Sequence, residues 1–431
     1  MIDIDSIENI VVDRCVKGFP PTSNAMKLRE IGLQKWNIMQ RDTSFPVATI
    51  SEEALHNNQR WMNEFLGKTG VKLAPHGKTT MAPQLLKMQI EANCWGITVA
   101  TVQQLAVCRE YGFDRILMAN QLTSSHAVTY VMNELHSDPN FQFYCLLDSI
   151  EGLERLARQC QDKKGSRPIE VLLEIGFDGG RTGFRDADEA IRAARFIARN
   201  DIGLAVAGIE TYEGLLVSDE ADVDEQSVRQ LLDRLVAVAA QCSTEGLFTR
   251  TPAILSAGGS AYYDMVADQL ASLVGSDQFE IIVRSGCYLT HDSAFYARLF
   301  DRITRRVPNL HGIDGELIPA LTVWSEVQSR PEPNLAILTM GRRDVSFDSG
   351  LPTPKWHLSD STNALSPIEN IEIFQLNDQH AYMRLPDNLN IQVGDIIGCG
   401  ISHPCTTFDK WKMLYVVDNE WTIKNAIMTF F

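Results

Sequence analysis

A lysine stands directly after a short apolar run and a Pro-His-Gly turn, in the segment 71–80 (VKLAPHGKTT). The pattern predicts the end of a strand, a turn, and then the amine of Lys78 presented just beyond the strand. In α/β barrels the loops after the strands converge at this edge, where active sites lie. In a partly dry pocket an ammonium group is easier to deprotonate, and the amine can then form a Schiff base with an aldehyde. The alternative for this segment alone is a surface lysine in a turn.

Two further segments place chemically useful side chains after later apolar runs. The segment 174–183 (EIGFDGGRTG) presents Arg181, and a guanidinium that keeps its proton suits permanent stabilisation of a phenolate. The segment 208–214 (GIETYEG) presents Tyr212, which could hydrogen-bond a ring nitrogen or transfer a proton. The alternatives are a solvated arginine in a tight turn and an aromatic ring packed over the top of the barrel.

A glycine-serine segment, 256–260 (SAGGS), precedes a predicted helix and follows the seventh apolar run. Successive backbone amides, a hydroxyl group and a helix N-terminus together form a phosphate-binding arrangement. Barrel enzymes frequently bind phosphate after strands seven and eight. The segment 283–288 (VRSGCY) follows the eighth run, and its residues 285–287 could complete the cradle.

A His-x-Cys pair, His403 and Cys405, lies in the segment 402–411 (SHPCTTFDKW). A lone histidine is usually a packing residue, but this pair can place an imidazole and a thiolate on one ion, and these donors suit Zn²⁺. Two protein ligands would leave positions open for water or substrate, as a catalytic metal requires.

The elements that must position these residues form a regular alternation. Eight short apolar runs are separated by helical segments, and they lie at 71–74, 95–99, 115–119, 141–147, 169–175, 204–209, 253–256 and 279–283. The clearest helical periodicity lies at 151–161, 187–199 and 225–242. This alternation predicts βαβ units and a parallel sheet, and eight runs over ~215 residues fit a closed (β/α)8 TIM barrel. The alternative is an open doubly wound sheet, although no G-x-G-x-x-G motif follows the first run.

After about residue 300 the helical signals thin out and short strand-like runs with polar turns take over. These runs lie at 321–328, 335–340, 368–376, 381–384, 395–399, 413–417 and 422–428. We therefore predict a barrel domain at 45–300 and a mainly antiparallel β domain at 301–431. Residues 1–44 are expected to pack against the β domain.

Composition excludes several classes of protein. The chain has 431 residues, 45% of them hydrophobic, and a formal charge of -16, so a nucleic-acid partner is not expected. No apolar run approaches the ~18 residues of a membrane span, and the acidic start lacks the features of a signal peptide. The nine scattered cysteines lack CxxC spacing, and most are expected to be reduced core residues in a cytoplasmic protein, with Cys405 of the His-x-Cys pair as the exception.

Taken together, the lysine after the first barrel strand, the glycine-serine cradle and the β domain resemble the fold-type III pyridoxal-phosphate enzymes, whose barrel is alanine-racemase-like. The closer resemblance is to the branch containing D-serine dehydratase, D-threonine aldolase and D-threo-3-hydroxyaspartate dehydratase, and residues 1–44 resemble an amino acid deaminase-like subgroup. Segments similar to motifs of that branch are 75–79 (Pro-His-x-Lys-Thr), 180–183 (Gly-Arg-x-Gly), 212–214 (Tyr-x-Gly), 258–260 (phosphate loop), 286–288 (Pro-Gly-x-Tyr, with Ser285 replacing the proline), and 376–380 and 403–405 (C-terminal motifs).

The resemblance implies a role for each candidate residue. Lys78 would form the Schiff base with pyridoxal 5'-phosphate and act in catalysis with Arg181, near the cofactor phenolate, and Tyr212. Other residues implied to bind the cofactor are His76, Gly258, Gly259, Ser260, Gly286, Cys287 and Tyr288. His403 and Cys405 would be the zinc pair of the dehydratases.

The function implied is a lyase that removes water from a D-β-hydroxy amino acid, such as D-serine or D-threonine, and releases a 2-oxo acid and ammonia. One alternative is retro-aldol cleavage to glycine and an aldehyde, as in D-threonine aldolase. Another, from a different class, is a non-catalytic pyridoxal-phosphate carrier, although such proteins lack a β domain. A homodimer is implied by the resemblance alone, because in this fold type the β domain of one subunit commonly completes the site of the other.

Overall fold

The computed structural model describes residues 2–161, 167–306, 312–386 and 389–431. Its first domain contains eight parallel strands in the order β4-β11-β10-β9-β8-β7-β6-β5. Their bounds are β4 Lys72–Leu73, β5 Ile97–Val99, β6 Arg115–Gln121, β7 Gln142–Leu147, β8 Ile169–Ile175, β9 Leu204–Thr211, β10 Ala253–Ser256 and β11 Phe279–Val283. Hydrogen bonds from Trp95 N to Leu73 O (2.7 Å) and from Thr98 N to Pro75 O (2.9 Å) join the two ends of the sheet. The predicted barrel is confirmed, and the open doubly wound alternative is wrong.

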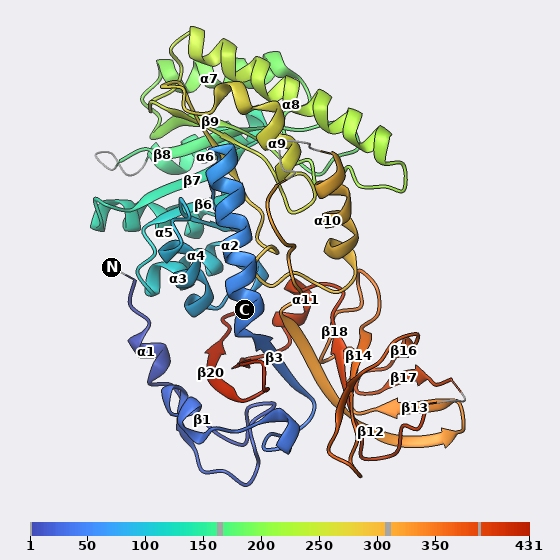
Figure 1. Cartoon of the computed structure of the whole chain (residues 1–431). Coiled ribbons are helices and arrows are strands. Elements are labelled where there is room, and N and C mark those ends of the chain that lie inside the picture. The colour runs from blue at the N-terminus through green and yellow to red at the C-terminus, as the bar shows by residue number, and fades with distance from the viewer. Residues whose placement is uncertain (1, 162–166, 307–311, 387–388) are drawn as a thin grey trace.

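Helices surround the barrel and alternate with its strands (Figure 1). Their bounds are α2 Glu52–Thr69, α3 Pro83–Glu91, α4 Val102–Glu110, α5 Ser125–Ser137, α6 Ile150–Gln161, α7 Ala187–Arg199, α8 Ala221–Thr244, α9 Tyr263–Gln269 and α10 Phe295–Arg306. Helix α7 shows why such segments fold: Asp186 caps its N-terminus, and residues 190, 191, 194 and 197 form one buried face against the sheet. None of the described helices combines the length and apolar character needed to cross a bilayer.

The inside of the barrel is filled by its own side chains. A separate buried apolar cluster includes Trp95, Tyr144, Leu172 and Ile254, each from a different part of the strand ring. A barrel packed in this way is a solid support, so a ligand can enter only at an end, among the loops.

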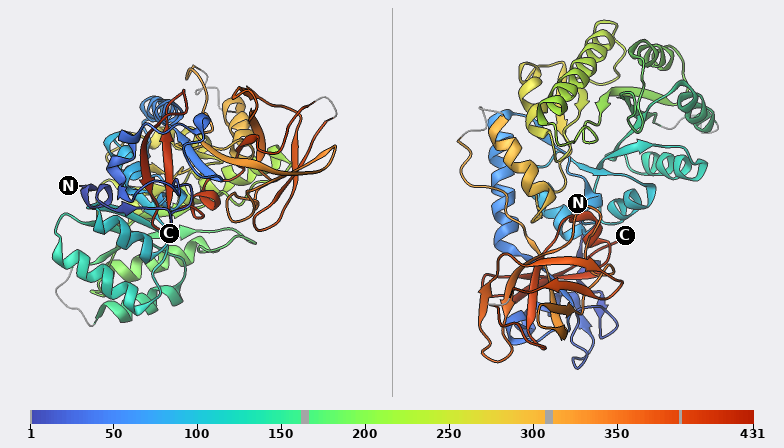
Figure 2. Two further views of the ribbon diagram at one scale, coloured as in Figure 1. Left: turned by 90° about the horizontal axis from the view of Figure 1, so that it is seen from below. Right: turned by 90° about the vertical axis from the view of Figure 1, so that its right-hand side faces the viewer.

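The second domain is a ten-stranded sheet that is almost entirely antiparallel. Its strands are β3 Val47–Ser51, β12 Leu321–Glu332, β13 Leu335–Leu338, β14 Thr353–Leu358, β15 Leu365–Pro367, β16 Glu372–Leu376, β17 Ala381–Arg384, β18 Ile396–Gly400, β19 Met413–Val417 and β20 Ile423–Met428. Strand β3 belongs to this sheet, antiparallel to β12 and parallel to β19, although the sequence pattern places it at the start of the barrel segment. The two domains lie end to end, and α2 runs from β3 along the barrel (Figures 1 and 2).

The N-terminal residues contact the β domain, and they also contact the barrel at the end of α4, where Asp3 N donates to Tyr111 O at 3.1 Å. They include α1 Asp5–Glu8 and the two-stranded sheet of β1 Val11–Val12 with β2 Met26–Lys27. Ile38 N donates to Trp421 O at 3.1 Å, and the Tyr415 hydroxyl donates to Gly18 O at 3.2 Å.

Candidate active site

A cavity of about 350 Å³ lies where the carboxyl ends of the barrel strands face the β domain. Parallel strands point their following loops to this edge, which is why residues far apart in sequence meet here. Ten of the predicted site residues line the cavity: His76, Lys78, Arg181, Tyr212, Gly259, Ser260, Gly286, Cys287, His403 and Cys405. Gly258 and Tyr288 do not line it. Tyr288 is instead 3% exposed within the core beneath the loop, so its side chain does not reach a ligand in this cavity.

Lys78 lies in a single turn of 3-10 helix, Gly77–Thr79, that follows β4 directly. Its side chain is exposed and lines the cavity, so its amine does not sit in the partly dry setting expected from the sequence. Burial, and then the charges of Lys78 and Arg284, hold the pKa of His76 well below its usual range. The Nδ1 atom of His76 is buried without a hydrogen-bond partner. A neutral imidazole with one unused nitrogen therefore lies two residues from the amine.

Arg181 and Tyr212 lie together on the opposite part of the cavity wall. The Arg181 guanidinium is 5.0 Å from the centre of the Tyr212 ring, a distance at which a cation and an aromatic face attract. Burial, and then the charge of Glu213, raise the pKa of Tyr212, so the phenol keeps its proton. A protonated phenol and a permanent cation can donate hydrogen bonds to an anionic ring oxygen or to a substrate carboxylate.

The glycine-rich loop after β10 differs from the open phosphate cradle expected from its sequence. The amides of Gly258 and Gly259 donate to the carboxylate of Glu213, at 3.2 and 2.6 Å. Glu213 is completely buried. These two amides are therefore already paired, and Ser260, which lines the cavity, has its hydroxyl 3.2 Å from that of the buried Ser285.

A buried ion pair forms part of the cavity wall and was not predicted. Arg284, at the end of β11, pairs with Glu210, at the end of β9, and also donates to the hydroxyl of Ser256 at 2.6 Å. Burial raises the pKa of Glu210 to about 8 against the opposing charge of Arg284, so this carboxyl can change protonation state near neutral pH. Its Oε2 atom is buried without a partner. The sequence signal was available, because both residues end barrel strands.

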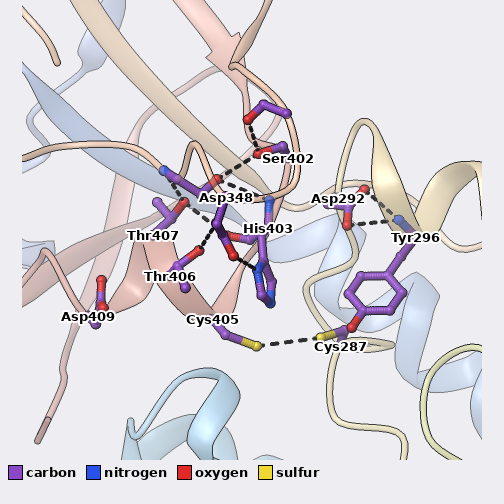
Figure 3. Close-up of polar contacts among 12 residues, drawn as sticks. Cys287, Asp292, Tyr296, Asp348, Ser402, His403, Cys405, Thr406, Thr407 and Asp409 are labelled. Carbon is purple, nitrogen blue, oxygen red and sulfur yellow. Dashed lines mark hydrogen bonds and ion pairs between the residues drawn. The ribbon is translucent and has the colours of Figure 1, made fainter. Parts of the chain in front are cut away.

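His403 and Cys405 reach the same cavity from the β domain, where Cys405 begins the short helix α11 Cys405–Phe408 (Figure 3). His403 Nδ1 lies 2.6 Å from Asp348 Oδ2. Burial alone would lower the pKa of His403, but hydrogen bonds and charge from Cys405 and Asp348 raise it to about 9.

Two residues beside this pair were not recognised as its neighbours. Cys287 Sγ lies 3.7 Å from Cys405 Sγ, and Tyr296, which also lines the cavity, has its ring 6.3 Å from the His403 ring (Figure 3). Hydrogen bonding from Cys287 lowers the pKa of the Cys405 thiol, while its hydrogen bond to Cys405 and its burial raise the pKa of Cys287. Cys405 is therefore the more acidic thiol of the two. Across the described ranges, no three or more His, Cys, Asp or Glu side chains are already grouped as a metal cage.

The β domain of the same chain completes this cavity. Cys405 Sγ lies 3.6 Å from the Thr79 hydroxyl, next to Lys78, so α11 contacts the loop after β4 directly. His403 and Cys405 therefore reach the cavity from the same chain as Lys78, and the homodimer implied by the resemblance stays a prediction.

Comparison with known proteins agrees with this architecture. The alanine racemase N-terminal domain model matches residues 50–275, and a serine dehydratase domain model matches residues 320–417. D-threonine aldolase from Arthrobacter sp is 23% identical over 363 residues, 84% of this chain and 85% of that protein. D-threo-3-hydroxyaspartate dehydratase from Delftia sp. (strain HT23) is 24% identical over 310 residues, 72% of this chain and 74% of that protein.

A solved structure of D-threonine aldolase from Filomicrobium marinum has the same fold, with a TM-score of 0.71 at 20% identity, covering 90% of this chain and 95% of that one. The resemblance predicted from the short motifs is thereby confirmed at the level of the family. Because the first domain match spans residues 50–275 of 431, more than half of the chain, the protein belongs to the alanine racemase N-terminal domain family, and its barrel is that of the fold-type III pyridoxal-phosphate enzymes.

Proposed function

We propose that the protein is a pyridoxal-phosphate- and zinc-dependent lyase that removes water from a D-β-hydroxy amino acid and yields a 2-oxo acid and ammonia. The observation that supports this most is the meeting of two sets of groups in one cavity. Lys78 comes from the barrel, and the His403–Cys405 pair comes from the β domain. An amine for the chemistry at Cα and metal donors for the β-hydroxyl are the two requirements of such an elimination.

The cavity fits pyridoxal phosphate in its size and in its unsatisfied groups. About 350 Å³ lies within the range of small-molecule sites. His76 Nδ1 and Glu210 Oε2 are buried polar atoms without partners in the cavity wall. A side chain at Gly286 would place its Cβ 2.6 Å from His76 O, so glycine keeps the backbone there close to the lysine loop. We assign Ser260 and Gly286 to the phosphate end, and Arg181 and Tyr212 to the ring.

The His403–Cys405 pair fits a zinc ion by its chemistry. Asp348 holds one nitrogen of the imidazole, and metal-binding histidines are usually oriented by such a carboxylate, which leaves the other nitrogen for the ion. Solved structures of the D-threo-3-hydroxyaspartate dehydratase include a His-to-Ala and a Cys-to-Ala variant, the second in a metal-free form, and the two changed positions are two residues apart. His403 and Cys405 have the same spacing.

The residues of the site then have definable roles. When bound, pyridoxal phosphate supplies an aldehyde for the substrate amine and an electron sink for the charge at Cα, and a zinc ion supplies a Lewis acid for the β-hydroxyl. The Lys78 Nζ atom accepts the Cα proton on its own side of the substrate. Arg181 and Tyr212 bind and orient, and the β domain limits access of water to the cavity.

Retro-aldol cleavage is the main alternative, because relatives with both activities match this chain. The thiol of Cys405 favours dehydration, since thiolates select zinc whereas oxygen ligands suit harder metals. The carrier alternative is disfavoured because a β domain contributes two side chains to the cavity.

Product analysis separates the three functions. The purified protein, loaded with pyridoxal phosphate, is assayed on D- and L-serine, threonine and 3-hydroxyaspartate, with and without a chelator. We expect ammonia and a 2-oxo acid from a D-substrate, with the rate lost in chelator and restored by Zn²⁺. Glycine plus an aldehyde would identify an aldolase instead, and bound cofactor without turnover would indicate a carrier.

A further inference from the structure

Two cysteines from different domains meet beside the proposed metal pair. Cys287 follows β11 in the barrel, and Cys405 begins α11 in the β domain, 118 residues later. Their sulfur atoms lie 3.7 Å apart at the cavity wall (Figure 3). The Cys287 side chain is 5% exposed, and its sulfur contacts Cys405 and, at 3.9 Å, the Thr79 hydroxyl.

The spacing of the sulfurs matches that of two ligands on one ion. Two thiolates bound to a tetrahedral zinc ion at about 2.3 Å lie about 3.8 Å from each other. From this agreement we propose that Cys287 is a third ligand of the metal ion held by His403 and Cys405. The proposal rests on the zinc-dependent function above, and it adds a barrel residue to a site otherwise built by the β domain.

The imidazole is placed to join the two thiolates. Because Asp348 holds Nδ1 of His403, the second ring nitrogen lies on the side of the two sulfurs (Figure 3). Among the residues that the structure describes, no three such side chains are arranged as a metal cage, so the proposal requires the three donors to come closer together when the ion binds. A Cys₂His set with a fourth position open is an arrangement found in catalytic zinc sites. Lys78 and Tyr296 line the same cavity.

Two other interpretations of this pair are a hydrogen bond between two free thiols, which the 3.7 Å spacing also fits, and a disulfide. A disulfide would require the sulfurs to approach from 3.7 Å to about 2.05 Å, and a two-electron oxidant to accept the electrons of both thiols. The spacing fits two metal ligands without such a displacement.

X-ray absorption at the zinc edge of the holoenzyme tests the proposal without relying on activity. We expect two sulfur atoms at about 2.3 Å in the unmodified protein, and one in each of Cys287→Ser and Cys405→Ser. Cys242→Ala, a buried cysteine of α8 outside the cavity, serves as the control and should keep two. In a competition assay with a chromophoric chelator, Cys287→Ser should raise the zinc dissociation constant at least about tenfold, whereas Cys242→Ala should not.

The outcomes distinguish this inference from the function on which it rests. A single zinc-bound sulfur in the unmodified protein, or two in Cys287→Ser, overturns the role of Cys287 and leaves the zinc-dependent lyase intact. Because the unmodified protein alone gives the first of these results, a variant that fails to fold does not block the test. Holoenzyme without zinc, in which a phosphine reductant releases two further thiols, overturns the proposal in favour of a disulfide. Holoenzyme that binds no zinc even with all thiols free refutes the zinc-dependent function itself.

Discussion

Glu213 allows a direct test of how the glycine-rich loop is held. Its buried carboxylate accepts hydrogen bonds from the amides of Gly258 and Gly259. In Glu213→Gln only one side-chain oxygen remains, and the new NH₂ group faces one of the two amides. One buried N–H then lacks an acceptor, which costs about 1–3 kcal/mol.

We therefore expect the free energy of unfolding of Glu213→Gln to fall by about 1–3 kcal/mol in urea denaturation. The loop that presents Ser260 loses its fixed position, and binding of pyridoxal phosphate must restore it. If cofactor binding must supply this whole free energy to order the loop again, the dissociation constant of the cofactor rises by up to about a hundredfold. Titration of the apoprotein with pyridoxal phosphate, followed by absorbance, measures this constant.

Asp395→Asn is a control in the β domain, because Asp395 is also buried and accepts backbone N–H groups of Asp360 and Gln392, both at 2.8 Å, in addition to its contact with His357 Nε2. It should lower stability without changing cofactor affinity. The opposite pattern for Glu213→Gln, tighter cofactor binding with unchanged stability, would refute the reasoning. It would mean that Glu213 competes with the phosphate instead of shaping its loop.

Four further outcomes follow from the same structure. Lys78→Ala should abolish the visible absorbance of lysine-bound pyridoxal phosphate, and an active, fully yellow variant would contradict the role of Lys78. Asp348→Asn should weaken zinc binding about 10- to 100-fold in a chelator competition, because His403 loses its orienting partner; unchanged affinity would count against the metal site. Gly286→Ala should weaken cofactor binding, because its Cβ would lie 2.6 Å from His76 O, whereas Gly67→Ala, with nothing within 4 Å, should not. Burial lowers the pKa of His291 to about 4, so below about pH 6.5 His291 binds a proton in the unfolded chain but not in the folded one. The free energy of unfolding should therefore fall by up to about 3 kcal/mol as the pH falls to 4. His291→Asn should remove this part of the acid sensitivity in urea denaturation.

The barrel could be predicted because its strands are buried on both faces. Parallel strands of this kind appear as continuous apolar runs, and the runs 253–256 and 279–283 coincide with β10 and β11. Strand β14 (TPKWHL) was missed, since it is mixed in polarity and contains a proline. The pairing of β3 with β12 could not be predicted either, because it joins residues such as Thr49 and Thr322 across most of the chain.

In the candidate site, the residues that line the cavity could be predicted better than the partners of their side chains. Motif spacing found Lys78, Arg181 and His403, because each follows an element whose end is visible in the sequence. Motif spacing did not predict that Glu213 accepts hydrogen bonds from the amides of the glycine-rich loop, or that Cys287 contacts Cys405. Both contacts depend on which side of a loop a side chain leaves, and this is decided by tertiary packing that no local pattern records.

The segment that carries the proposed metal donors, His403 and Cys405, is held by hydrogen bonds to a neighbouring loop. Asp348 accepts a hydrogen bond from the Thr406 hydroxyl at 2.6 Å as well as bonding His403, and Ser346 N donates to the Thr407 hydroxyl at 3.0 Å. Two loops of the β domain thus fix each other, and a preorganised donor set is what a metal-assisted step requires. Since the same family of barrels serves different reactions, the chemistry at the β-carbon should depend on this segment of the β domain, while the barrel supplies the cofactor site.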